Sequence, residues 1–218
     1  MKSWKLLVAA LVLSGCAAVE YTQTDIVPLK REDRTSLRDA PNVAVVLYPI
    51  PNPTFNGYVD QRIIDVRTQT GIEAPLDRVR ERFVTRLTGP LGYPATLRQP
   101  PVRVASDSVE ALRASVNAPL VLDFATRSWG LAKPGQSGGE AKADDPIYVH
   151  LFVRARLVRL SDGVILWRAV CGLRGYAGDE TAKLPDLVAG GGVLLRQKLD
   201  VAADRCADEL VEFFQGAD

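Results

Sequence analysis

A strand-turn-strand unit near residue 160 constrains the fold of this chain more than any other feature. From 147 to 157 every odd position is apolar, while the even positions carry Tyr, His, Phe and two Arg. This is the period of a strand with one buried face. Ser161-Asp162-Gly163 is a tight-turn signal, and a second apolar run, Val164–Cys171, follows it. We therefore predict an antiparallel hairpin of strands 147–160 and 164–171, which requires a sheet around it.

The rest of the chain alternates strand and helix patterns. Apolar runs predict strands, and apolar residues at helical spacing predict helices. These elements are a strand at 43–48, helices at 75–92 and 106–117 with a short strand at 95–97 between them, a long strand at 119–129 and a closing helix at 192–214. Residues 58–66 suit a strand or a helix equally. The predicted fold class is α+β, a two-layer α/β sandwich with a mixed, largely antiparallel sheet and helices packed on one face.

The first fifteen residues have the pattern of an export signal. Two lysines precede the apolar stretch Leu6–Leu13, which is shorter than the roughly 20 residues of a transmembrane helix and suits a secretory signal. The next residues, Leu13-Ser14-Gly15-Cys16, resemble the lipobox of bacterial lipoproteins. That resemblance implies cleavage before Cys16 and a diacylglycerol thioether on its sulfur. The alternative is an ordinary secreted protein that is cut after Ala17 or Ala18.

Lipidation of Cys16 places the protein in the cell envelope without a membrane-spanning helix. Each buried methylene contributes about 0.8 kcal/mol, so two or three acyl chains hold the protein durably. Ala17 rather than aspartate follows the cysteine. By analogy with the enterobacterial sorting rule, this predicts the periplasmic face of the outer membrane. The chain then divides into a signal peptide (1–15), a lipidated N-terminus and polar tether (16–40) and a single globular domain (41–218) with a flexible loop at about 132–146.

The cysteine count is odd, and lipidation of Cys16 leaves two thiols for an oxidising compartment. Cys206 falls on the apolar stripe of the closing helix, and Cys171 ends the hairpin. We predict a disulfide between Cys171 and Cys206. The alternative is a pair of buried free thiols.

The segments 120–129, 149–157 and 162–167 resemble the core of small periplasmic lipoproteins with βαβββα-type domains. Such domains occur in curli-secretion lipoproteins and in auxiliary lipoproteins of envelope lipid-transport systems. The resemblance covers roughly half the chain and implies a non-catalytic module that docks on other envelope proteins. The glycine-rich loop after Trp129 and the pair of Cys171 and Cys206 depart from that pattern.

We find no motif of a catalytic or metal site in the sequence. His150 is the sole histidine, with no cysteine or carboxylate at a metal-ligand spacing, so a structural role is favoured over a catalytic or zinc-binding one. A Ser-His-Asp triad would need His150, and nothing else indicates one. Asp123 and Asp145 are isolated, which predicts solvated or locally hydrogen-bonded carboxylates. Gly190-Gly191-Gly192 is interpreted as a hinge before the last helix rather than an anion site.

Arg78, Arg82 and Arg86 lie four residues apart and share one helical face. They are a candidate contact for lipid phosphates or an acidic partner. The favoured alternative is a solvated face, because Asp77 and Glu81 lie beside them.

These features lead to three functional hypotheses. The first is a lipid-anchored, periplasm-facing accessory protein that supports an envelope assembly or transport complex through contacts with other envelope proteins. The second is a carrier of a small apolar or lipid ligand, which needs a cavity between the helices and the sheet. The third is an enzyme whose site the sequence does not reveal. We expect no enzyme activity and no cofactor or metal, and the formal net charge of +1 argues against a nucleic-acid partner. The oligomeric state stays open.

Overall fold

The computed structural model describes residues 26–55, 58–59, 61–133, 142, 144–172 and 181–216. The export signal, Cys16 and most of the predicted loop at 132–146 lie outside these residues. The elements are α1 (Arg31–Arg38), β1 (Val43–Leu47), β2 (Thr54–Phe55), β3 (Tyr58–Val59), α2 (Gln61–Thr70), α3 (Leu76–Thr88), η2 (Ala95–Arg98), β4 (Val102–Arg103), α4 (Val109–Ser115), β5 (Leu120–Ala132), β6 (Tyr148–Arg159), β7 (Val164–Cys171) and α5 (Leu184–Gln215).

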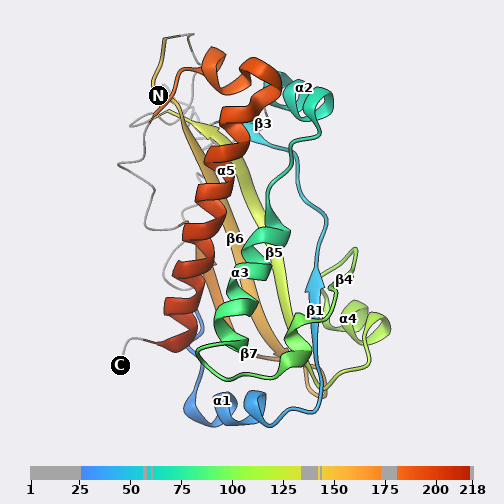
Figure 1. Ribbon diagram of the computed structural model, residues 1–218. Helices are drawn as coiled ribbons and strands as arrows, with labels where there is room; N and C mark the ends of the chain where they lie inside the picture. The colour runs from blue at the N-terminus through green and yellow to red at the C-terminus, as the bar shows by residue number, and fades with distance from the viewer. Residues whose placement is uncertain are drawn as a thin grey trace, which may run out of the picture.

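The fold is α+β and is built on a mixed sheet (Figure 1). β5 pairs in parallel with β1 and β2 and antiparallel with β6, and β6 continues into the antiparallel hairpin with β7. Short β4 and β3 extend the sheet from β1 and β2. The long ladders are the antiparallel ones, as predicted. The order β1, α3, β5, β6, β7, α5 is the βαβββα order implied by the resemblance.

The helices α3 and α5 lie side by side along one face of the sheet (Figure 1). Their apolar stripes meet the inward side chains of β5, β6 and β7 in one large core. Phe83 on α3 is at its centre, with ring centroids 5.6 Å from Phe124, 5.8 Å from Trp167 and 5.6 Å from Phe214. Such edge-to-face and stacked rings bind α3, the sheet and the end of α5 together.

The short helix α4 covers part of the opposite face of the sheet. Its Leu112 is fully buried and packs with Val46, Val121 and Val158, which alternate along their strands with residues of the main core. The two faces of β1, β5 and β6 are therefore both buried at this end of the sheet. The helical layer is on one face as predicted, with α4 as an additional cover on the other.

The folded part begins earlier than the predicted boundary at residue 41. Val27 forms an antiparallel bridge with Arg168 on the edge strand β7, and α1 follows it. Leu29 and Leu37 are buried in the main core. Residues 26–40 are therefore part of the domain, and the prediction of a tether that continues to residue 40 is wrong. The polar composition of this segment does not predict a packed helix, because only two buried apolar side chains, Leu29 and Leu37, dock it on the core.

Three local predictions also change. The stretch from Ala95 is a 3-10 helix rather than a strand, because Pro94 and Pro100 limit it to a single turn. The undecided segment 58–66 contains both alternatives, β3 and then the start of α2. The closing helix begins at Leu184 and continues through a kink at the three glycines. No helix within the described residues is long and apolar enough to cross a membrane.

Candidate functional site

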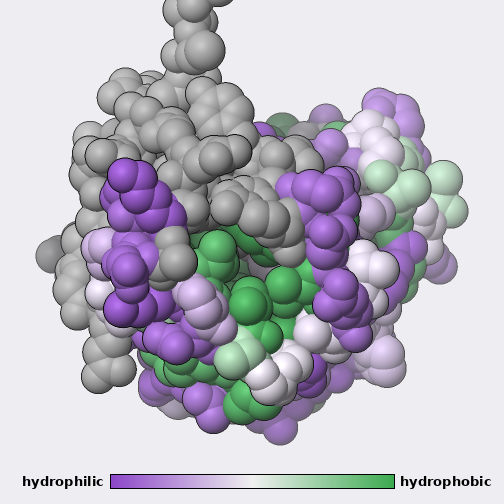
Figure 2. Space-filling model, turned by 90° about the horizontal axis from the view of Figure 1, so that it is seen from above, coloured by the Kyte–Doolittle hydropathy of each residue, from purple (hydrophilic) through white to green (hydrophobic). Residues whose placement is uncertain are grey.

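An apolar pocket opens at the end of the molecule where α2, the start of α5 and the end of β5 meet. Figure 2 shows it from above as a hydrophobic hollow with hydrophilic side chains on parts of its rim. Its volume is about 360 Å³. The lining residues that the structure describes are all apolar: Ile63, Val66, Leu131, Leu184, Pro185, Val188 and Leu195. The layer between helices and sheet is therefore hollow at this end, whereas the aromatic cluster fills it at the other.

A glycine kink in α5 shapes the mouth of this pocket. Gly190, Gly191 and Gly192 have φ of 57°, 71° and 74°, so the chain leaves helical geometry and resumes it at residue 193. Left-handed backbone of this kind is costly for residues with a Cβ. A Cβ on Gly192 would lie 2.5 Å from Cδ1 of Ile72. The glycines interrupt the helix, which agrees with the predicted hinge, although a first helical part precedes them and the close contact is with Ile72 rather than with the sheet.

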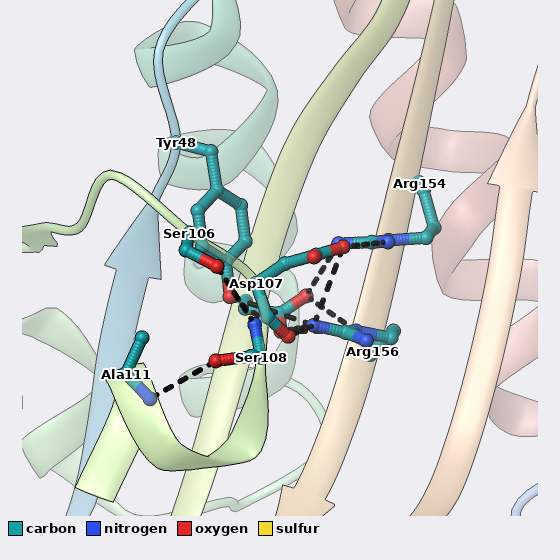
Figure 3. A network of polar contacts seen from close by, with 8 residues as sticks. Tyr48, Ser106, Asp107, Ser108, Ala111, Arg154 and Arg156 are labelled. Atoms are coloured by element: carbon teal, nitrogen blue, oxygen red, sulfur yellow. Dashed lines mark hydrogen bonds and ion pairs between the residues drawn. The ribbon is translucent and has the colours of Figure 1, made fainter.

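A buried network of charged side chains lies on the face of the sheet beside α4, opposite the face that α3 and α5 cover (Figure 3). Asp123 on β5 has no exposed surface, and it sits directly across the ladder from Arg156 on β6. Arg156 donates from Nε at 3.1 and 3.0 Å and from Nη2 at 2.6 Å to the two carboxylate oxygens. The Tyr48 hydroxyl donates to the same carboxylate at 3.0 Å. The prediction of a solvated or locally hydrogen-bonded Asp123 is wrong, since β5–β6 pairing supplies Arg156, a partner far away in the sequence.

Asp107, in the loop before α4, completes this network. Arg154 donates to its Oδ2 at 2.7 Å and lies 3.6 Å from Asp123, while Arg156 donates to its backbone carbonyl at 3.0 Å. The network therefore ties the α4 loop to the centre of the sheet. Two carboxylates face two guanidinium groups, so the charges cancel within the chain.

The pKa shifts in this network keep its groups in their charged or hydroxyl forms. Burial, followed by the charge of Asp123, raises the pKa of the Tyr48 hydroxyl. Burial lowers the pKa of Arg156, but its hydrogen bonds and charge interaction with Asp123 outweigh that and raise it. The Arg154 hydrogen bond lowers the pKa of Asp107. Each carboxylate of the network is bound by an arginine, and we interpret the network as structural.

His150 is buried on β6 and has two hydroxyl neighbours. Its Nε2 lies 3.1 Å from Oγ of Ser128 and 3.2 Å from Oγ1 of Thr54. Burial lowers its pKa to about 4. Its Nδ1 is buried without a hydrogen-bond partner among the described residues. A Ser-His-Asp triad needs a carboxylate at that nitrogen to orient the ring, so this serine-histidine contact supports the structural role that we predicted.

The arginines of α3 are paired within the chain. Three aspartates on α5, also spaced by four residues, face them across the helix interface. The contacts are Arg78 to Asp204 at 2.8 Å and to Asp200 at 3.6 Å, Arg82 to Asp208 at 2.7 Å and to Asp204 at 3.6 Å, and Arg86 to Asp208 at 3.5 Å. The sequence shows the same four-residue spacing in both sets, a signal of pairing that the prediction of a solvated face does not use. The arginine face is a helix-helix ion-pair ladder rather than a face of unpaired charge.

The structure brings the predicted cysteine pair together. Cys171 at the end of β7 and Cys206 on α5 form a disulfide with their Cα atoms 5.0 Å apart. Both are fully buried in the main core. The predicted pairing is confirmed, and it fixes α5 to the edge strand of the sheet.

Asp145 is locally bonded, as predicted. It accepts from the backbone N–H of Lys142 at 2.8 Å and pairs with Lys133 at 3.1 Å, and these contacts lower its pKa. Within the described ranges, no three His, Cys, Asp or Glu side chains converge in a way that would hold a metal ion.

No protein-family model matches this chain, and no curated protein matches it. Among solved structures, the PelC dodecamer from Paraburkholderia phytofirmans is similar to it at 16% identity and a TM-score of 0.33, over 78% of this chain and 91% of that one. A variant of the same dodecamer gives 14% identity and a TM-score of 0.31, over 77% and 94%. Scores this low do not establish a shared fold.

Proposed function

We propose that this chain is a lipid-anchored accessory protein of the cell envelope that faces the periplasm and acts by contact with other envelope proteins. The observation that carries the proposal is the sequence Leu13-Ser14-Gly15-Cys16 directly after a short basic and apolar stretch. Nine residues, 17–25, separate Cys16 from the first described residue of the domain, Ile26. A compact domain would thus be held close to the membrane surface.

The polar groups of the domain support a role without catalysis. The buried charges around Asp123 are neutralised by their own neighbours, and the arginines of α3 are neutralised by α5. His150 has a pKa lowered to about 4 and lacks an orienting carboxylate at Nδ1 among the described residues. A general acid or base works best with a pKa near the operating pH, which is not the case for this histidine.

The anchor is tested by the mass and location of the mature protein. We expect the wild-type protein to lack residues 1–15, to carry the mass of two or three acyl chains and to fractionate with the outer membrane. Cys16→Ser should abolish acylation, and Ala17→Asp should keep acylation while moving the protein to the inner membrane if the sorting rule applies. An unacylated wild-type protein would refute the anchor.

The contact role is tested by crosslinking in living cells. Val164 and Val201 are large apolar side chains that are 43% and 49% exposed on the edge strand and on α5. Photoreactive residues at these two positions, followed by mass spectrometry, should capture a defined envelope protein or a second copy of this chain. If both positions yield only the free protein, the contact role fails for these two surfaces.

A second candidate function is the binding of an apolar ligand, and the pocket at the α2 end specifically favours it. Such a ligand needs a cavity between the helices and the sheet. The pocket provides one, with an open mouth and an apolar lining among the described residues.

A further inference from the structure

We propose that the apolar pocket holds one acyl chain of a membrane lipid and that its mouth faces the membrane. This inference rests on the proposed lipid anchor, because the anchor decides which surface the domain lies beside. It specifies the ligand of the second candidate function and the orientation of the domain.

The lining of the pocket selects the chemistry of its occupant. The seven lining side chains that the structure describes contain no nitrogen or oxygen. They include Ile63 and Val66 on α2 and Leu184, Val188 and Leu195 on α5. A phosphate, sugar or charged peptide group inside would lose its water and find no side-chain hydrogen bond in return. Only an apolar group lowers its free energy by entering the pocket, and any polar head group must stay at the mouth.

The size of the pocket suits part of one acyl chain. An apolar cavity of about 150 Å³ is known to take benzene, with its six carbons. The volume here is about 360 Å³, so on the same scale it holds on the order of a dozen carbons. It also lies near the lower end of the 300–1,000 Å³ range of ordinary ligand pockets. A whole lipid with two chains does not fit.

The direction of the chain places the anchor on the pocket side. Leu131, which lines the pocket, pairs with Val149 at the start of β6. β6 runs from there to the turn at 161–163, and β7 returns toward the pocket end. Val27 pairs antiparallel with β7 at Arg168, so the backbone at Val27 runs away from the pocket toward α1, at the far end in Figure 1. The described chain therefore begins at Ile26 on the pocket side of Val27, and the segment that carries Cys16 is attached there.

The length of the N-terminal segment agrees with this orientation. Residues 16–25 extend to at most about 35 Å. In the proposed orientation the anchored Cys16 and the pocket mouth lie on the same side of Val27, and the bilayer is the nearest reservoir of acyl chains. An anchor that left from the α1 end would instead turn the pocket away from the membrane.

The test uses the mature lipidated protein in vesicles of phosphatidylethanolamine and phosphatidylglycerol. A fraction of the lipid carries a diazirine at the end of one acyl chain, and peptides are mapped by mass spectrometry after irradiation. We expect crosslinks in α2 and in residues 184–195. Val188→Glu, which puts a carboxylate on the pocket wall, should lower their yield about tenfold, equivalent to roughly 1.4 kcal/mol of binding. Val201→Glu, on an exposed part of the same helix, should not lower it.

Val66→Glu on α2 is the second pocket variant, used if Val188→Glu does not fold. Crosslinks that are absent from the pocket peptides, or that are equally abundant in the pocket and control variants, overturn the inference. A pocket filled by the protein's own anchor also gives no crosslink to vesicle lipid and overturns it. The intact mass separates this failure from that of the proposed function, since an unacylated mature protein refutes the anchor, whereas an acylated one with an unlabelled pocket refutes only the inference.

Discussion

The single histidine predicts a specific dependence of stability on pH. His150 is only 6% exposed, and burial lowers its pKa from 6.5 to about 4. Between these values the unfolded chain binds a proton that the folded chain does not, so stability falls as the pH falls from about 6.5 toward about 4. The whole shift corresponds to roughly 3 kcal/mol, at about 1.36 kcal/mol for each pKa unit. About 2 kcal/mol of it should be lost by about pH 5.

Other groups with lowered pKa act at lower pH. Asp107 and Asp204 have pKa values below the usual aspartate range because of their arginine partners. Each contributes stability that is present above the unfolded pKa and is lost as the pH falls through the folded pKa, below about 4. The window between about pH 5 and about pH 7 therefore isolates His150.

The assay is urea unfolding of the mature protein in a mild detergent, followed by tryptophan fluorescence. Trp129 and Trp167 are both buried, so unfolding exposes them. We expect the unfolding free energy to fall by about 2 kcal/mol between about pH 7.5 and about pH 5. His150→Gln, which keeps a hydrogen-bonding group beside Thr54 and Ser128, should remove most of that fall. The same slope in wild type and variant, or no slope in wild type, would refute the reasoning.

Three further predictions concern stability in the same assay. Replacing Cys171 and Cys206 by alanine should cost about 3.5 to 4 kcal/mol, because the bond closes a loop of 35 residues; no change in urea midpoint would contradict this. Asp123→Ala removes the main partner of the nearly buried Arg156 guanidinium and should cost about 3 to 5 kcal/mol, whereas Arg82→Ala on the half-exposed ladder should cost at most about 1 kcal/mol; similar losses for the two would be inconsistent with the difference in burial. Gly192→Ala places a side chain in left-handed backbone against Ile72 and should cost about 1 to 2 kcal/mol, and an unchanged midpoint would count against the kink.

Much of the fold follows from local periodicity. The alternation from 147 to 157 and the turn at 161–163 specify the hairpin, because a period of two can bury only one face of a strand. Helical spacing of apolar residues likewise identifies α3, α4 and the main part of α5. Short elements escape this reasoning. α1 has one buried apolar side chain, Leu37, and η2 is a single turn between prolines, so neither repeats long enough to show a period.

The polar contacts divide in the same way. The ladder between α3 and α5 was readable in principle, since arginines and aspartates each recur at four-residue spacing on helices predicted to pack on the same sheet. The partner of Asp123 was not readable, because only the β5–β6 register places Arg156 opposite it. A shift of one residue would have put that arginine on the other face.

The sequence alone predicts an export signal and a lipid anchor. It also determines the longer helices and strands and indicates the pairing of Cys171 with Cys206. These depend on composition and on spacing along the chain. The tertiary structure alone decided that residues 26–40 belong to the domain, that Asp123 and Arg156 pair in the sheet, and that α2, β5 and α5 leave a hollow between them. Each of these depends on how segments far apart in the chain are placed in space. The spacing of residues within one segment does not predict that placement.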